Sequence, residues 1–144
     1  MNGSGQHMPA VIAELIEVAA ARTDMHDLKE GQLRLFAARG ETLSQQVEQL
    51  HKRIAQTDSL IEGIAAQREA LAVQVSLIAE ELASQRELLA KGLAQVSRVL
   101  ALQREEARLQ GVIGELAASR AQAEGRIIET EIEILRLQSG RREE

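Results

Sequence analysis

The chain has 144 residues, of which 44% are hydrophobic and 27% are charged, and its net charge is −5 at pH 7. Phe36 is its only aromatic residue, and it contains one Pro and no Cys. A compact core of this size normally includes several aromatic side chains, because each buries roughly 150–250 Å². The remaining Leu, Ile, Ala, Gln, Glu and Arg are mostly good helix formers. The composition therefore excludes all-β and α/β folds and predicts an all-α chain.

Several classes of function are also excluded by composition. An acidic chain without a basic stripe does not suit nucleic acid as its main partner. The absence of Cys removes disulfides and thiol catalysis. No apolar run approaches the ~18–20 residues of a membrane span, and no cleavable signal is visible. The three His are dispersed and no nucleotide-binding or nucleophile motif is present, so we expect no enzyme activity, no cofactor and no metal site.

At the amino end, residues 1–8 resemble a cloning leader, and we expect the chain to be a fragment of a longer protein. Residues 9–22 follow as a predicted short helix. The segment Thr23-Asp24-Met25-His26-Asp27 resembles the capped start of a new helix, so we expect a break near residues 23–26. A long helix over residues 27–90 then forms the first arm of the predicted fold.

Residues 43–89 carry an apolar series with alternating steps of four and three. Its members are Leu43, Val47, Leu50, Ile54, Thr57, Ile61, Ile64, Arg68, Leu71, Val75, Ile78, Leu82, Gln85 and Leu89. A second series, in residues 99–137, keeps the same rhythm. Its members are Val99, Leu102, Glu106, Leu109, Ile113, Leu116, Arg120, Ala123, Ile127, Thr130, Ile134 and Leu137. This spacing places each series on one helix seam that supercoils around a partner helix.

A tip loop at residues 91–96 is predicted to separate the two arms. Lys91 and Gly92 read as a helix end, because a cation suits the negative terminus and Gly tolerates the left-handed conformation that follows it. Ser97 reads as the N-cap of the second long helix, residues 97–142. A link this short makes the helices antiparallel. We therefore expect a long antiparallel two-stranded coiled-coil hairpin with a short additional N-terminal helix.

The two series can be tested against this hairpin. If the chain folds back between residues 93 and 94, the residue numbers of two facing positions should sum to about 187. The pairs that satisfy the sum include Leu89 with Val99, Ile78 with Leu109, Leu71 with Leu116, Ile54 with Ile134, and Leu50 with Leu137. The polar interruptions also match, with Thr57 opposite Thr130 and Arg68 near Arg120. Paired polar layers can fix register. We expect the two arginines to reach outward towards Glu69 and Glu124.

Residues 9–42 have no partner in this scheme. They nevertheless carry two apolar stretches, which comprise Val11, Ile12, Leu15, Ile16 and Val18 and then Leu33, Leu35 and Phe36. In a longer protein, the chain that continues beyond Glu144 would cover them. In this chain, we expect the exposed surface to recruit another copy or to fold back.

The tip carries a resemblance to a known family. Arg86, three intervening residues, Ala90, six intervening residues and Ser97 match the spacing of the Arg–Leu–Ser tip motif of periplasmic adaptors, also called membrane-fusion proteins. Ala90 departs from this motif, because it stands at the Leu position. Residues 33–39 and 86–93 are similar to the HlyD-type branch, which serves type I protein secretion. The resemblance covers most of residues 9–144.

The resemblance implies a periplasmic hairpin, with its parent anchored in the inner membrane, that links an ABC exporter to a TolC-like outer-membrane channel. Copies would self-associate into a ring. Docking would fall to Arg86, Leu89, Ala90, Leu93 and Ser97, with Leu89 or Leu93 supplying the apolar contact. The alternatives are a generic scaffold coiled coil, such as a cytoplasmic hairpin arm, and a parallel homodimer without a hairpin.

Overall fold

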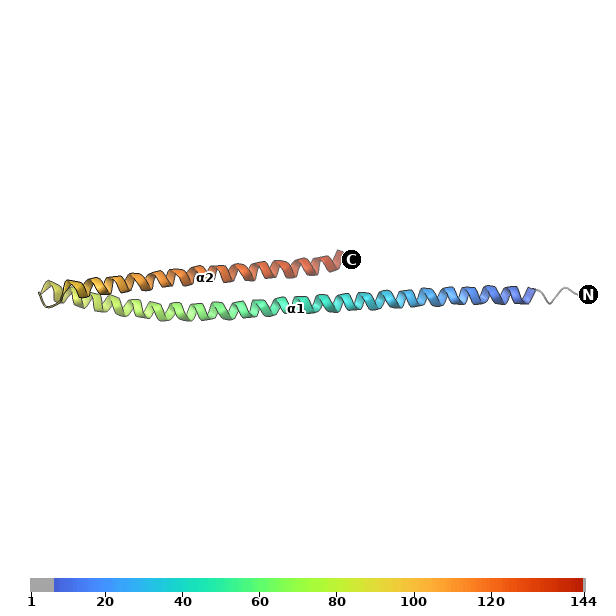
Figure 1. Cartoon of the computed structure of the whole chain (residues 1–144), viewed down its shortest axis with the longest axis horizontal. Coiled ribbons are helices and arrows are strands. Elements are labelled where there is room, and N and C mark those ends of the chain that lie inside the picture. Colours follow the sequence, from blue (N-terminus) through green and yellow to red (C-terminus); the bar gives the residue numbers. More distant parts are fainter. Residues whose placement is uncertain (1–6, 144) are drawn as a thin grey trace, which may run out of the picture. The chain divides into compact units, whose positions relative to one another are not determined.

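The computed structural model describes residues 7–143, which form two helices, α1 (His7–Ala90) and α2 (Val96–Glu143) (Figure 1). No strand occurs within these residues. The all-α hairpin that the sequence predicts is therefore confirmed. The expected leader lies mainly in residues 1–6, outside the described part. The chain divides into two units, one up to Gln46 and one from Val47 onward, and each is described by itself.

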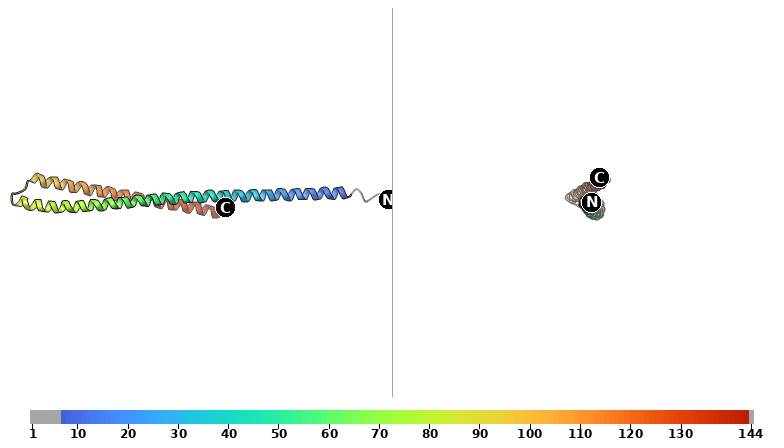
Figure 2. Two further views of the ribbon diagram at one scale, coloured as in Figure 1. Left: turned by 90° about the horizontal axis from the view of Figure 1, so that it is seen from below. Right: turned by 90° about the vertical axis from the view of Figure 1, so that its right-hand side faces the viewer.

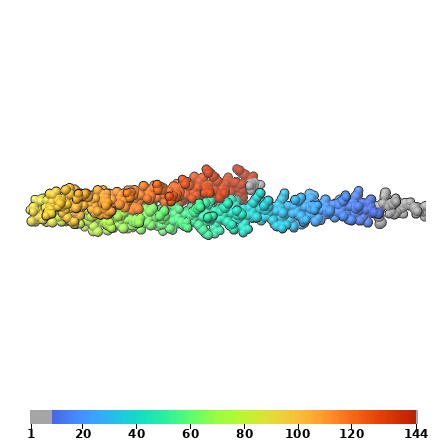
Figure 3. Space-filling model, in the orientation of Figure 1, coloured from blue at the N-terminus to red at the C-terminus, as the bar shows by residue number. Residues whose placement is uncertain are grey.

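In the unit that starts at Val47, the rest of α1 and the whole of α2 lie side by side and are joined at the tip (Figures 1 and 2). Their side chains fill the space between the two helices (Figure 3). Every seam position from Val47 to Leu89 and from Val99 to Leu137 is buried or partly buried. The buried apolar residues of the described part all belong to the two predicted series: Leu50, Ile64, Leu82, Val99, Leu102, Leu109, Ala123 and Ile134.

The best-packed part of the seam lies next to the tip. Leu82, Val99 and Leu102 form a buried cluster, and Ile78 and Leu89 pack against it from α1. Burial of an aliphatic side chain of this size contributes roughly 1.5–3 kcal/mol. Apolar contacts next to the tip loop therefore stabilise the hairpin.

Two threonines occupy seam positions and are partly buried there. The hydroxyls of Thr57 and Thr130 donate to the carbonyls of Arg53 and Arg126 in their own helices, at 2.9 and 2.8 Å. Each hydroxyl is thus satisfied one turn back, and no bond between the helices is needed.

The two arginines of the seam behave differently from each other. Arg120 Nε lies 3.0 Å from Glu124 Oε1, as the sequence predicts. Arg68 forms no ion pair with Glu69 within residues 7–143, and its Nε is buried without a hydrogen-bond partner there. Only one of the two expected outward ion pairs therefore forms.

The break predicted at residues 23–26 is wrong, and so is the separate short helix over residues 9–22. Helix α1 is continuous from His7 to Ala90. The segment contains neither Pro nor Gly, and the Thr23 hydroxyl donates to the Ala19 carbonyl at 2.9 Å, inside the helix. His26 Nε2 lies 3.3 Å from Glu30 Oε1, one turn ahead. Thr23 and His26, two of the polar residues that resemble a cap, thus find partners along a helix that passes through them.

Neither helix carries a stretch apolar and long enough to cross a membrane within residues 7–143.

Candidate functional site: the hairpin tip

The helix α1 ends in a hydrogen-bonded turn. The Gly92 amide donates to the Leu89 carbonyl at 3.0 Å, and the Leu93 amide donates to the Leu88 carbonyl at 2.8 Å. Gly92 has a φ of 72°, the left-handed conformation that only Gly adopts at little cost. These two bonds and the positive φ define a Schellman motif. The helix end predicted at Lys91 and Gly92 is confirmed, and the connection covers residues 91–95.

This turn places an apolar side chain at the apex. Leu93 is 72% exposed, and Val96, at the start of α2, is also exposed. Arg86 and Ala90 are exposed too, and their spacing of four residues places them on one face of α1. No ion pair involves Arg86 within the described residues. The tip therefore presents a cation beside a small apolar surface.

Leu89 is placed differently from the other candidates. It is partly buried and packs against the cluster of Leu82, Val99 and Leu102. Of the two leucines that the sequence offers as the apolar contact, Leu93 is thus the one whose side chain is free at the surface.

Ser97 is exposed, but it is not the N-cap of α2. The helix begins at Val96, so Ser97 lies inside the first turn and Gln95 occupies the cap position. The Arg98 amide donates to the Gln95 carbonyl at 3.2 Å, and the Ser97 hydroxyl donates to Gln95 Oε1 at 3.4 Å. The backbone thus provides the first turn, which leaves the Ser97 hydroxyl on the surface of the tip.

An ion pair that the sequence analysis missed joins the two helices beside the tip. The Arg98 guanidinium donates to the Glu81 carboxylate across the hairpin, and both side chains are partly exposed. Neither residue belongs to the apolar seam series, so the three-four pattern gave no signal for it. The pair adds a contact between α1 and the first turn of α2.

The other ion pairs of the hairpin each join two residues of one helix. Glu105 and Arg108 form a two-bond contact at 3.0 and 2.6 Å. The hydrogen bond from Arg108 holds the pKa of Glu105 below its usual value and raises the pKa of Arg108. No group of three or more His, Asp or Glu that could hold a metal occurs in the described part of the chain.

Comparisons with known proteins agree with this architecture. The family model described as "AprE, long alpha-helical hairpin" matches residues 3–144. The chain is also 41% identical over 133 residues to the type I secretion system membrane fusion protein PrsE of Rhizobium meliloti (strain 1021). No solved structure matches.

The match to PrsE covers 92% of this chain but 29% of PrsE, so the chain spans less than a third of that relative's length. The family match, in contrast, includes both helices and the tip. The chain therefore belongs to the family of AprE-type long α-helical hairpins, in agreement with the HlyD-type resemblance of its sequence.

Proposed function

We propose that this hairpin is the periplasmic arm of a type I secretion adaptor, which links an inner-membrane ABC exporter to a TolC-like outer-membrane channel. The observation that carries the proposal is the tip, where Arg86 at the end of α1, Leu93 in the hydrogen-bonded turn and Ser97 at the start of α2 are all exposed. The similarity to PrsE, named a type I secretion membrane fusion protein, supports it. The role is structural, and other parts of a longer protein would contact the exporter.

The three residues offer complementary contacts. The Arg86 guanidinium can donate several hydrogen bonds in a fixed fork, which suits the carbonyls and carboxylates at the end of a channel helix. The Ser97 hydroxyl can both donate and accept. Leu93 offers an apolar side chain to a groove, with Ala90 leaving room beside it. Each contact is modest, and several hairpins that dock on one channel would add their contributions through multivalency.

The test is binding of the chain to a purified TolC-like channel. The double variant Arg86→Ala, Ser97→Ala should weaken binding by about tenfold or more, because two polar contacts are lost at the centre of a small interface. Leu93→Ala should weaken it separately. Circular dichroism should show unchanged helicity for both, since none of these side chains is buried.

A matched control removes the same residue types away from the tip. Ser76→Ala with Arg126→Ala changes two exposed positions of α1 and α2 and should leave binding unchanged. If the tip and control variants bind equally well, docking through the tip is wrong. A scaffold coiled coil would show no channel binding for any of these proteins, including the unchanged chain.

A further inference from the structure

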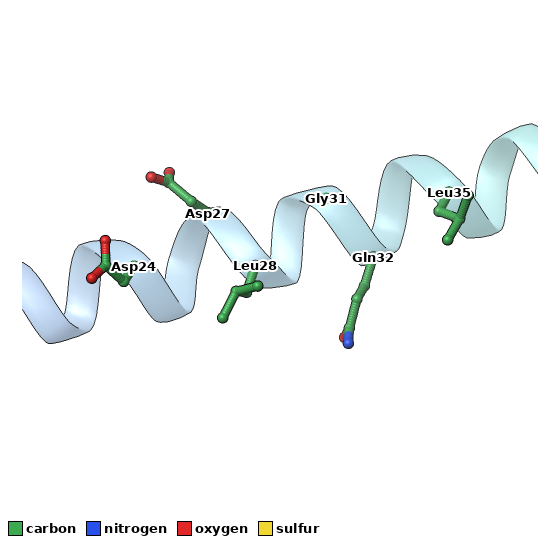
Figure 4. A pocket seen from close by; sticks show the side chains of 6 residues that line it. All are labelled: Asp24, Asp27, Leu28, Gly31, Gln32 and Leu35. Atoms are coloured by element: carbon green, nitrogen blue, oxygen red, sulfur yellow. The ribbon is translucent and has the colours of Figure 1, made fainter.

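The amino-terminal unit carries a second heptad pattern that the hairpin does not use. Positions at alternating steps of three and four form what we call the arm stripe: Val18, Ala21, Met25, Leu28, Gln32 and Leu35. All six are exposed. In Figure 4, the side chains of Leu28, Gln32 and Leu35 project from the same side of α1, next to the notch at Gly31. An exposed stripe with this spacing is a seam for a partner helix.

The charges that flank the arm stripe indicate which partner fits. In heptad notation, Val18, Met25 and Gln32 occupy a positions and Ala21, Leu28 and Leu35 occupy d positions. The g positions are then Glu17, Asp24 and Gly31, of which the first two are acidic. The e positions are Arg22, Lys29 and Phe36, of which the first two are basic. One flank of the stripe is therefore negative and the other positive.

This arrangement distinguishes parallel from antiparallel pairing of identical helices. In a parallel, in-register pair, a g residue meets the e residue five positions later in the partner. Glu17 would then meet Arg22 of the second copy, and Asp24 would meet Lys29. In an antiparallel pair, g faces g and e faces e, so like charges would meet. The flanks thus favour a parallel pair.

The four charged residues have no alternative partner on their own helix. None has an opposite charge three or four residues away, and none forms an ion pair within residues 7–143. Neighbouring side chains do pair in this way: His26 and Arg34 both contact Glu30. Glu17, Arg22, Asp24 and Lys29 are thus free to make contacts between copies.

The residues of the stripe agree with this geometry. Leu at d positions and a β-branched residue at an a position, here Val18, suit parallel two-stranded coiled coils. Gln32 is the polar a position, and a parallel in-register pair places its amide against the same amide of the second copy. Two amides can hydrogen-bond to each other, which fixes register in the way a buried polar layer does.

We propose that residues 18–35 form a parallel, in-register two-stranded coiled coil with a second copy of this chain. The occupant of the stripe is thus another copy that points the same way. The proposal does not depend on docking to a channel, since it concerns the chain alone.

Because the chain has no cysteine, single cysteines report the pairing directly. In a parallel in-register pair, Ala21→Cys and Leu35→Cys each meet their own copy, so both variants should form disulfide-linked dimers on mild oxidation. An antiparallel pair brings at most one of these two positions against itself. Ala20→Cys is the matched control, because Ala20 is an exposed neighbour off the stripe, and it should cross-link far less.

Charge reversal provides the second arm of the test. Glu17→Lys with Asp24→Lys makes both flanks basic, and Arg22→Glu with Lys29→Glu makes both acidic. In sedimentation equilibrium, each variant alone should have a dimer dissociation constant raised by about tenfold or more, and an equimolar mixture should recover the affinity of the unchanged chain. Three outcomes would overturn the proposal: a chain that stays monomeric at high concentration, cross-linking at only one of the two stripe positions, or equally strong cross-linking of Ala20→Cys. If the chain is monomeric, the partner of the arm stripe would be a different helix, such as one that follows residue 144 in a longer protein.

Discussion

Single residues decide where the hairpin turns. Gly92 has a φ of 72°, and nothing lies within 4 Å of the position that a Cβ atom would occupy there. The requirement for Gly is thus a matter of backbone conformation, with no steric contribution from neighbours. Gly114 has equally open surroundings, but it lies inside α2, where Gly only weakens the helix.

The same substitution should therefore have opposite effects at these two glycines. Gly92→Ala should lower the free energy of unfolding by about 1 kcal/mol, because an L-residue is forced into the left-handed region. Gly114→Ala should raise it by about 1 kcal/mol, because Ala is the better helix former. Urea unfolding followed by circular dichroism measures both. Equal effects of the two variants would contradict the role assigned to Gly92.

Residue-scale prediction from sequence succeeds where a backbone requirement selects the residue type and fails where a side chain has several choices. Gly92 is recognisable because few other residues tolerate its conformation. Ser97 reads as a cap because caps favour Ser, yet Gln95 fills that place and the helix starts one residue earlier. The Arg98–Glu81 pair cannot be predicted from the three-four spacing, because its two long side chains meet from positions outside the seam.

At the scale of elements, the three-four spacing of apolar residues is sufficient to predict which positions pack between the two helices. All predicted positions from Val47 to Leu137 are at least partly buried. The predicted break in α1 fails for a different reason. Polar residues at 23–27 are compatible with both a cap and a helix interior, and without Pro or Gly the backbone continues. Periodicity thus identifies contact faces better than it identifies the ends of helices.

The seam should carry most of the stability of α2. Leu109 is 2% exposed, whereas Leu135 on the same helix is 64% exposed. Leu109→Ala should cost about 3 kcal/mol, since it removes buried methyl groups and leaves a cavity, while Leu135→Ala should cost less than about 0.5 kcal/mol. Thermal and urea unfolding of the two variants compare them directly. Similar losses would mean that residues 99–137 are not packed along the predicted series.

At the scale of the whole molecule, the two units should differ in how they respond to protein concentration. The hairpin from Val47 onward is held by contacts within one chain, so its melting temperature should not depend on concentration. In the amino-terminal unit, residues 9–39 are all exposed, so its helicity should melt at a lower temperature that rises with concentration as copies pair.

Circular dichroism at 222 nm over a wide range of concentrations separates these two transitions. The Glu17→Lys, Asp24→Lys variant should lose the concentration dependence of the lower one and keep the upper one unchanged. A single transition that moves with concentration would show instead that the hairpin itself is intermolecular, and the fold described above would then be incorrect.

The hydrogen-bonded turn at residues 91–95 has a consequence for the affinity and lifetime of a complex formed at the tip. Because the amides of Gly92 and Leu93 already donate to carbonyls of the preceding helix, a channel that docked at the tip as proposed would meet an apex that is organised in advance. Little loop entropy is then lost on contact, which favours affinity beyond what so small an area would otherwise give. Loosening this turn would shorten the lifetime of a complex even where every contacting side chain is retained.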